Sequence, residues 1–151
     1  MFADDTKVWT RISTLKDGEL LQDDLNNLMS CPDKWKLGFN PEECKVMHIG
    51  HSLDTKYSMK VQGKVWELEE TTEERDLGII VTSNLKPSRQ CVKAASKARS
   101  VLGWINRHFG SLNADELKIL YKIHVRPHME FCIQAWSPYL QKDIRCLEKI
   151  Q

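Results

Sequence analysis

The chain has 151 residues, of which 41% are hydrophobic and 28% are charged, and its formal net charge is +1. These values are typical of one globular domain and exclude collagen-like, low-complexity and disordered chains. No apolar run approaches the roughly 20 residues of a membrane-spanning helix, and the acidic start of the sequence is unlike a secretory signal. The composition therefore favours a folded protein that has no membrane partner.

The five cysteines are an odd number, and no two of them form a Cys-x-x-Cys pair. Secreted domains use cysteines in pairs as a disulfide framework, whereas reducing compartments keep them as thiols. We therefore expect an intracellular protein with reduced cysteines.

The small net charge hides two oppositely charged halves. Residues 1–76 hold 10 Lys and Arg against 16 Asp and Glu, a net −6, and residues 77–151 hold 12 against 5, a net +7. A basic half indicates a polyanionic partner, most simply nucleic acid. The alternative is that both halves are merely solvated, because net charge predicts partners only loosely.

The first half predicts short strands around one helix. Residues 1–12 predict a hairpin with two aspartates at its turn and a returning strand at 8–12. A helix is expected after an N-cap at Asp17, because leucines recur at helical spacing, and Pro32 should end it. Alternating or β-branched apolar residues predict strands at 44–50, 57–61, 65–66 and 77–81.

The second half predicts helices, and the first of them extends from Pro87 to Gly110. Its apolar face is expected to comprise Val92, Ala95, Leu102, Ile105 and Phe109. Four cations fall roughly opposite that face and form what we call the basic stripe: Arg89, Lys93, Lys97 and Arg107. The alternative for the basic stripe is an ordinary solvated helix face.

Further helical segments follow. Asn113 with Glu116 predicts the N-terminus of a second helix, which Pro127 should break or kink. Residues 129–136 and 140–151 are two more apolar stretches with helical character.

Asp4 and Asp5 are the sharpest local feature of the chain. Adjacent carboxylates repel each other, so a shared hard cation such as Mg²⁺, which takes oxygen ligands, stabilises both ionised forms. The alternative is an ordinary surface turn, in which such a pair is common.

A rival metal site would use histidine and cysteine. The candidates at a spacing of four are His124, His128 and Cys132, and also Cys44 and His48. Zinc accepts such ligands, but Pro127 disrupts the helix that would align the first set. We therefore expect ordinary core or surface residues here.

A series of short motifs resembles one known family. The motifs are Phe2-Ala3-Asp4-Asp5-Thr6-Lys7, Leu21-Gln22-Asp23-Asp24-Leu25, Trp35 with Phe39-Asn40, Cys44-Lys45-Val46-Met47, Asp76-Leu77-Gly78, Val125-Arg126-Pro127-His128 with Glu130-Phe131-Cys132, and Trp136-Ser137-Pro138-Tyr139. In this order, over nearly the whole chain, the sequence resembles the reverse transcriptase of non-LTR (LINE-type) retrotransposons, especially the jockey-like group. Cys31 and Pro32 depart from the family, which usually has an aromatic residue near that point.

The resemblance implies an α+β fold. Residues 1–82 would be a truncated right-hand polymerase palm, with short antiparallel strands plus a helix from the catalytic Asp-Asp hairpin onward. Residues 85–151 would be a helical thumb-like region, truncated at its C-terminus. Residues 77–81 would belong to the strand that grips the primer through its backbone.

The same resemblance implies roles for particular residues. Asp4 would be a catalytic, metal-binding aspartate and Asp5 its supporting neighbour, with Mg²⁺ as the cofactor of two-metal nucleotidyl transfer. Lys45 would be the general acid for the leaving pyrophosphate, and its alternative is an ordinary exposed lysine. The basic stripe would contact the phosphates of an RNA template–DNA primer duplex, and deoxynucleoside triphosphates would be the substrates of the intact parent.

The family's first catalytic aspartate, nucleotide pocket and fingers all precede the Asp-Asp hairpin, where this chain has no residues. Two neighbouring carboxylates cannot supply the oxygen ligands for two ions. We therefore expect a fragment of an RNA-directed DNA polymerase that binds Mg²⁺ weakly and is inactive by itself. The alternative is a non-catalytic nucleic-acid-binding or interaction remnant of a decayed retrotransposon.

Overall fold

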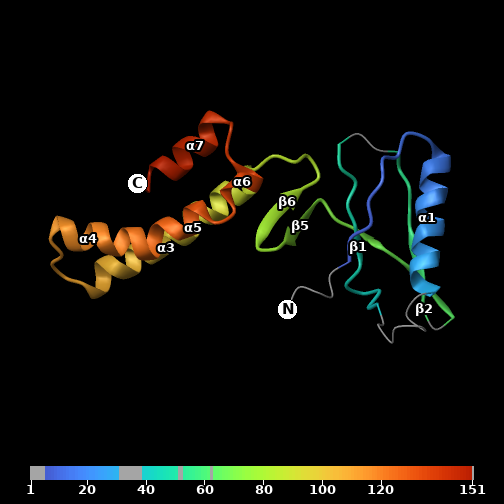
Figure 1. Cartoon of the computed structure of the whole chain (residues 1–151), viewed down its shortest axis with the longest axis horizontal. Helices are drawn as coiled ribbons and strands as arrows, with labels where there is room; N and C mark the ends of the chain where they lie inside the picture. Colours follow the sequence, from blue (N-terminus) through green and yellow to red (C-terminus); the bar gives the residue numbers. More distant parts are fainter. Residues whose placement is uncertain (1–5, 31–38, 51–52, 62, 151) are drawn as a thin grey trace. The chain divides into compact units, whose positions relative to one another are not determined.

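The structure is a computed structural model that describes residues 6–30, 39–50, 53–61 and 63–150 (Figure 1). The chain forms two compact units, Met1–Glu73 and Glu74–Gln151. Helices and short strands occur together, so the expected mixed α+β composition is confirmed. The predicted division between 82 and 85 concerns the palm and thumb of a polymerase and stays a prediction.

In its described residues, the first unit combines one helix with two strand pairs. Its elements are α1 (Leu15–Ser30), β1 (Lys45–Val46), β2 (Ser58–Val61), β3 (Lys64–Glu67) and β4 (Glu69–Glu70). β2 and β3 form the predicted antiparallel hairpin, with Ser58 opposite Glu67. β1 pairs with β4 in parallel, so the expectation that the strands are all antiparallel is wrong.

α1 packs on β2 through both side-chain and backbone contacts. The Gln22 amide binds the backbone of Ser58 twice: Nε2 donates to the carbonyl oxygen at 2.8 Å, and Oε1 accepts from the amide at 2.9 Å. Tyr57 and Met59, the residues on either side of Ser58, are both buried. The alternation at 57–61 therefore predicted the buried face correctly.

The N-terminus of α1 differs from the prediction. Thr14, rather than Asp17, is the N-cap, because its Oγ1 accepts from the Asp17 amide at 3.4 Å. Asp17 lies three residues later and accepts from the amides of Thr14 at 2.7 Å and Ser13 at 2.9 Å. These backbone bonds, led by that from Ser13, lower the pKa of the Asp17 carboxyl below its ordinary value. The predicted stop at Pro32 lies outside the described residues.

Two predicted strands are absent or shorter than expected. Residues 6–12 have no regular secondary structure, and Trp9 is 88% exposed, so the returning strand at 8–12 is wrong. No described strand pairs with that segment, and an extended segment without a partner gains no ladder hydrogen bonds. The strand expected over 44–50 is reduced to β1.

The second unit is a strand hairpin followed by helices (Figure 1). Its elements are β5 (Glu73–Asp76), β6 (Ile79–Thr82), α3 (Ser88–His108), α4 (Ala114–Leu120), η1 (Tyr121–Val125), α5 (Arg126–Glu130), α6 (Ile133–Trp136) and α7 (Gln141–Glu148). α3 is the longest described helix, and it contacts η1, α5, α7 and β6. The core of this unit therefore forms along one face of α3.

The core includes small residues of α3 and larger side chains of the helices that pack on it. Its buried members are Cys91, Ala94, Ala95, Ala98, Ile105, Val125, Met129, Trp136, Leu147 and Ile150. Val92 and Phe109, which were expected on the apolar face, are 58% and 42% exposed. The buried face is therefore rotated toward the alanines.

The helix after α3 begins as predicted but continues past Pro127. Asn113 and Glu116 form the expected capping box, with the Asn113 side chain accepting from the Glu116 amide and the Glu116 carboxylate accepting from the Asn113 amide. The following turn is a π-helix, in which the Arg126 amide donates to the Tyr121 carbonyl oxygen. A widened turn accommodates a proline that would clash with the carbonyl four residues earlier in a regular α-helix.

None of the helices in the described part of the chain is long and apolar enough to cross a bilayer.

Leu77 and Gly78 form the turn between β5 and β6 and are not part of the strand predicted over 77–81. Both have positive φ, 45° and 90°, which is the combination that a type I′ hairpin turn requires. A Cβ at Gly78 would lie 3.2 Å from Cε1 of Phe131. Glycine therefore serves both the turn and the close approach of the ring.

Replacing Gly78→Ala should lower the free energy of unfolding by about 1–3 kcal/mol, because alanine is strained at this φ and its Cβ crowds Phe131. Gly110→Ala is the matched control, since Gly110 is exposed and has no positive φ, and a Cβ added there would meet no atom within 4 Å. Urea unfolding followed by circular dichroism measures both. Equal midpoints for the two variants would contradict this account of the turn.

Candidate nucleic-acid interface

The proposed metal pair, Asp4 and Asp5, lies outside the described residues. Lys45 is exposed in β1, with Glu69 as its partner in the strand register. The distance from Lys45 to Asp4 and Asp5 is therefore outside the described geometry. The role of Lys45 as a general acid stays a prediction.

The residues of the rival zinc site do not converge. His124 lies in η1 and His128 in α5, and Cys132 follows α5 with a left-handed φ of 52°. Among the described residues, no three His, Cys, Asp or Glu side chains are grouped so that they could hold a metal ion.

The basic stripe lies on one side of α3, away from the helix face that packs. Arg89, Lys97 and Arg107 are exposed, and Lys93 is partly exposed. The first three cations of the stripe are spaced four residues apart, about 6 Å along the helix axis, and the stripe spans about 27 Å to Arg107. The predicted arrangement of the four side chains is therefore present.

α3 carries charge of only one sign. It includes five Lys and Arg residues and no Asp or Glu. Helices more often mix charges on their exposed faces, because alternating pairs at a spacing of four stabilise them. The surface of α3 thus presents only positive side-chain charge.

The N-terminus of α3 is held by a buried carboxylate from another helix. Ser88, the first residue of α3, donates its hydroxyl to Oδ2 of Asp143 at 2.6 Å, and Asp143 is 3% exposed. Asp143 lies in the first turn of α7, so its negative charge is close to the positive ends of two helices. This contact fixes α7 against the start of α3.

Cys91 is a packing residue. Its side chain is fully buried, and burial, followed by the negative charge of Asp143 and the neighbouring Cys146, raises the pKa of its thiol to about 11. A thiol that remains protonated at neutral pH is a poor nucleophile and a poor metal ligand. The environment of Cys91 therefore supports its assignment to the core.

An aromatic cluster at the end of α3 was not predicted. Trp104 is 50% exposed, and its ring stacks on His108 with centroids 4.6 Å apart, while Phe109 meets it edge-on at 6.2 Å. Trp104 follows Lys97 by seven residues, two helical turns on the same side. A tryptophan at that spacing among cations, rather than among apolar residues, is the signal that could have revealed it.

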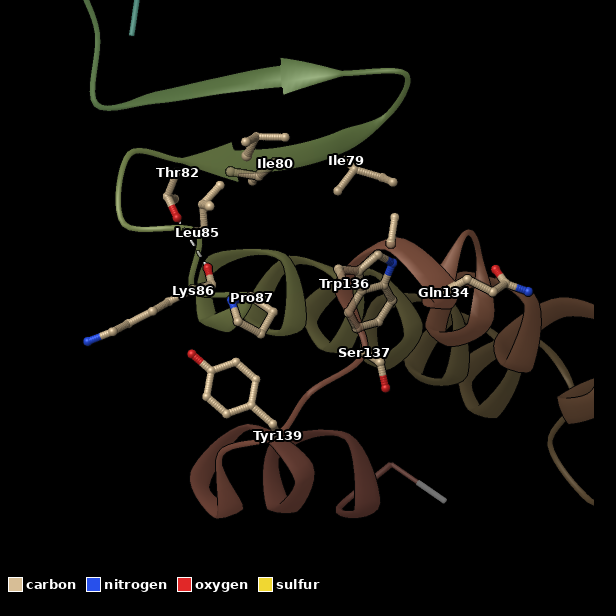
Figure 2. Close-up of a pocket in the computed structure, with 12 residues that line it drawn as sticks. Ile79, Ile80, Thr82, Leu85, Lys86, Pro87, Gln134, Trp136, Ser137 and Tyr139 are labelled. Atoms are coloured by element: carbon tan, nitrogen blue, oxygen red, sulfur yellow. Dashed lines mark hydrogen bonds between the residues drawn. The ribbon is translucent and has the colours of Figure 1, made fainter. Parts of the chain in front are cut away.

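A hollow lies beside β6 (Figure 2), and its volume is about 300 Å³. Its lining comprises residues 79–82, 85–87, 134–137 and Tyr139. Two polar groups of the lining bind within the protein: the Thr82 hydroxyl contacts the Lys86 carbonyl at 3.2 Å, and Trp136 Nε1 donates to the Phe131 carbonyl. Gln134, Ser137 and Tyr139 add further polar side chains to the lining.

β6 lies in the segment that the family resemblance assigns to the primer grip. One of its backbone amides is hydrogen-bonded to a side chain of α3. The Ile80 amide donates to Oε1 of Gln90, which is buried in α3, at 3.0 Å. This bond fixes β6 to α3, and the role of the strand in gripping a primer stays a prediction.

No protein-family model, curated protein or solved structure matches the chain. The relation to reverse transcriptases therefore depends on the motifs quoted above.

Asp143→Ala should lower the free energy of unfolding by about 1–3 kcal/mol, because the Ser88 hydroxyl loses its acceptor and two helix ends lose a negative charge. Asp143→Asn keeps an acceptor oxygen and should lose less. Glu148→Ala, an exposed change in the same helix, is the control and should have little effect. Thermal unfolding that gives Asp143→Ala and Glu148→Ala the same midpoint would contradict the anchoring role of Asp143.

Proposed function

We propose that this chain is part of a right-hand polymerase related to non-LTR reverse transcriptases, and that its basic stripe holds an RNA–DNA duplex by its phosphates. The observation that carries the binding proposal is α3, a 21-residue helix with five cations and no acidic side chain. The series of family-like motifs and the mixed α+β composition support the ancestry.

The chemistry of the stripe favours phosphates over bases. Its first three side chains project from one side of α3 at intervals of about one turn, and Arg107 follows about 15 Å further along, so the cations can follow one strand of a duplex. Lysine and arginine contacts to phosphate oxygens position a duplex without reading its sequence. Binding by α3 is therefore tolerant of sequence, as a polymerase needs.

The catalytic part of the proposal belongs to the intact parent. There, Asp4 and Asp5 would hold Mg²⁺, the primer 3′-hydroxyl would attack the α-phosphorus of a deoxynucleoside triphosphate, and pyrophosphate would leave. Lys45 would donate a proton to that leaving group. Two neighbouring carboxylates supply few of the oxygen ligands that two ions take, so we propose that this chain alone binds nucleic acid without extending a primer.

The binding proposal is tested by the salt dependence of affinity. If about four phosphates are neutralised, the logarithm of the association constant should fall against the logarithm of salt concentration with a slope of about −3 to −4. Lys93→Gln and Lys97→Gln should each reduce the steepness by about one and weaken all sequences alike. Fluorescence anisotropy of a labelled RNA–DNA hybrid measures this.

The matched control is Lys149→Gln, since Lys149 is an exposed lysine that follows α7, which packs on the buried face of α3. It should leave the slope nearly unchanged. Slopes that are the same for all three variants, or no binding at low salt, would reduce the stripe to a solvated helix face.

The catalytic proposal predicts weak binding of Mg²⁺ to the chain, because magnesium keeps its waters when few protein oxygens converge. Calorimetric titration should give a millimolar or weaker affinity, and primer extension with a hybrid and all four deoxynucleoside triphosphates should give no product. A micromolar affinity that Asp4→Ala removes and Asp54→Ala retains would show a complete metal site and overturn this expectation.

The encoding DNA separates the enzyme fragment from the non-catalytic remnant. An open frame upstream that supplies fingers and a further aspartate supports a piece of an active enzyme. Stop codons or frameshifts there support the remnant, whose binding through α3 would be the same.

A further inference from the structure

Two side chains at the end of α3 bind back to carbonyls of the same helix. His108 lies with Nδ1 2.9 Å from the Trp104 carbonyl oxygen, and because a carbonyl only accepts, Nδ1 carries the proton. Arg107 Nε donates to the Gly103 carbonyl at 3.2 Å. Both acceptor carbonyls precede that of Ile105, which accepts from the Phe109 amide at 3.0 Å, so these two side-chain bonds add to the backbone bonds of the helix.

Part of the Trp104 ring remains exposed to solvent. His108 covers part of the Trp104 ring, yet half of the Trp104 side chain remains exposed. Tryptophan at a protein surface exposes apolar area that water solvates poorly. A ring that is already held in place loses little conformational freedom when another flat group stacks on it.

The surroundings of the cluster select for a polyanion. Trp104 continues the side of α3 that bears Lys93 and Lys97, and Arg107 is less than one turn away. No acidic side chain occurs in α3. A protein partner would need its own acidic side chains to neutralise the cations of α3. A nucleic acid carries phosphates and aromatic bases in the same strand, so it matches both the cations and the ring.

We propose that Trp104 is a stacking site for an unpaired nucleobase that extends from the duplex held by the basic stripe. This inference depends on the proposed function and adds a second kind of contact to it. A base inside a duplex is covered on both faces by its neighbours, whereas a base of a single-stranded extension can turn a face to the ring. Stacking on an aromatic side chain accepts any base, since each base has a π-face.

The experiment compares the full chain and its variants on three labelled RNA–DNA hybrids at low salt. One hybrid is blunt, one has a short single-stranded extension, and one has an extension of the same length made of abasic units. Wild type should bind the natural extension best, and the abasic extension should bind like the blunt hybrid apart from its additional phosphates.

Trp104→Ala should weaken binding of the natural extension by about 5- to 100-fold, which is the range that base stacking covers, and should leave the blunt hybrid unchanged. Trp104→Phe should retain most of the affinity, because it keeps a stacking ring. Trp9→Ala removes a tryptophan that is 88% exposed in the other unit, and it should have no effect.

The outcomes separate this inference from the proposed function. If none of the three hybrids binds, the basic stripe itself is not a nucleic-acid site. If the blunt and the naturally extended hybrids both bind and Trp104→Ala weakens the two equally, the stripe stands and the stacking site is overturned. The same conclusion follows if the abasic extension binds as well as the natural one. Sedimentation checks a further occupant: a wild-type dimer that becomes a monomer in Trp104→Ala would assign the ring to self-association and also overturn the inference.

Discussion

The second unit depends on the small side chains along one face of α3. Cys91, Ala94, Ala95 and Ala98 are all buried; the alanines end at Cβ, and Cys91 has only its sulfur beyond Cβ. Small residues allow neighbouring helices to approach closely, so α5, η1 and α7 can all contact this one face. Their larger side chains, such as Val125, Met129 and Leu147, then fill the core.

This division of α3 into two faces also determines what the helix can do. Once one face is used for packing, charged residues can occupy the other without any cost of burial. The buried Asp143 secures the first turn to α7 through Ser88, and the His108 and Arg107 side chains bind carbonyls one turn earlier in α3. The cations and Trp104 are consequently displayed on a helix that is anchored at its N-terminus and packed along one face, which is the preorganisation that the proposed binding requires.

Local signals predicted the elements whose chemistry is contained in a few neighbouring residues. The alternation around Met59 predicted β2, and Asn113 with Glu116 predicted the start of α4. Asp17 was misplaced because an aspartate suits both the cap and the third residue of a helix, and only the hydrogen bonds of Thr14 distinguish the two. The π-helical turn before Pro127 was not predictable, because its backbone adjusts to packing as well as to the proline.

Some residues of the candidate site could be predicted from local spacing, and others could not. Spacing alone placed the four cations on one side of α3, since helical periodicity is independent of tertiary contacts. Trp104 escaped notice because a tryptophan is ordinarily assigned to the core, and its exposure depends on the alanine face taking all of the packing. The polymerase roles of Asp4, Asp5 and Lys45 come from family resemblance, and these roles stay predictions.

The central claim is that one face of α3 packs and the other binds nucleic acid. Lysine footprinting tests it most directly: the full chain is acetylated with and without a saturating RNA–DNA hybrid, and modification is quantified at each lysine by mass spectrometry. The account predicts that the hybrid protects Lys93 and Lys97, whereas Lys142 and Lys149 of the α7 region react as they do in the unbound chain. Equal protection of all four lysines, or protection of the α7 lysines alone, would contradict it.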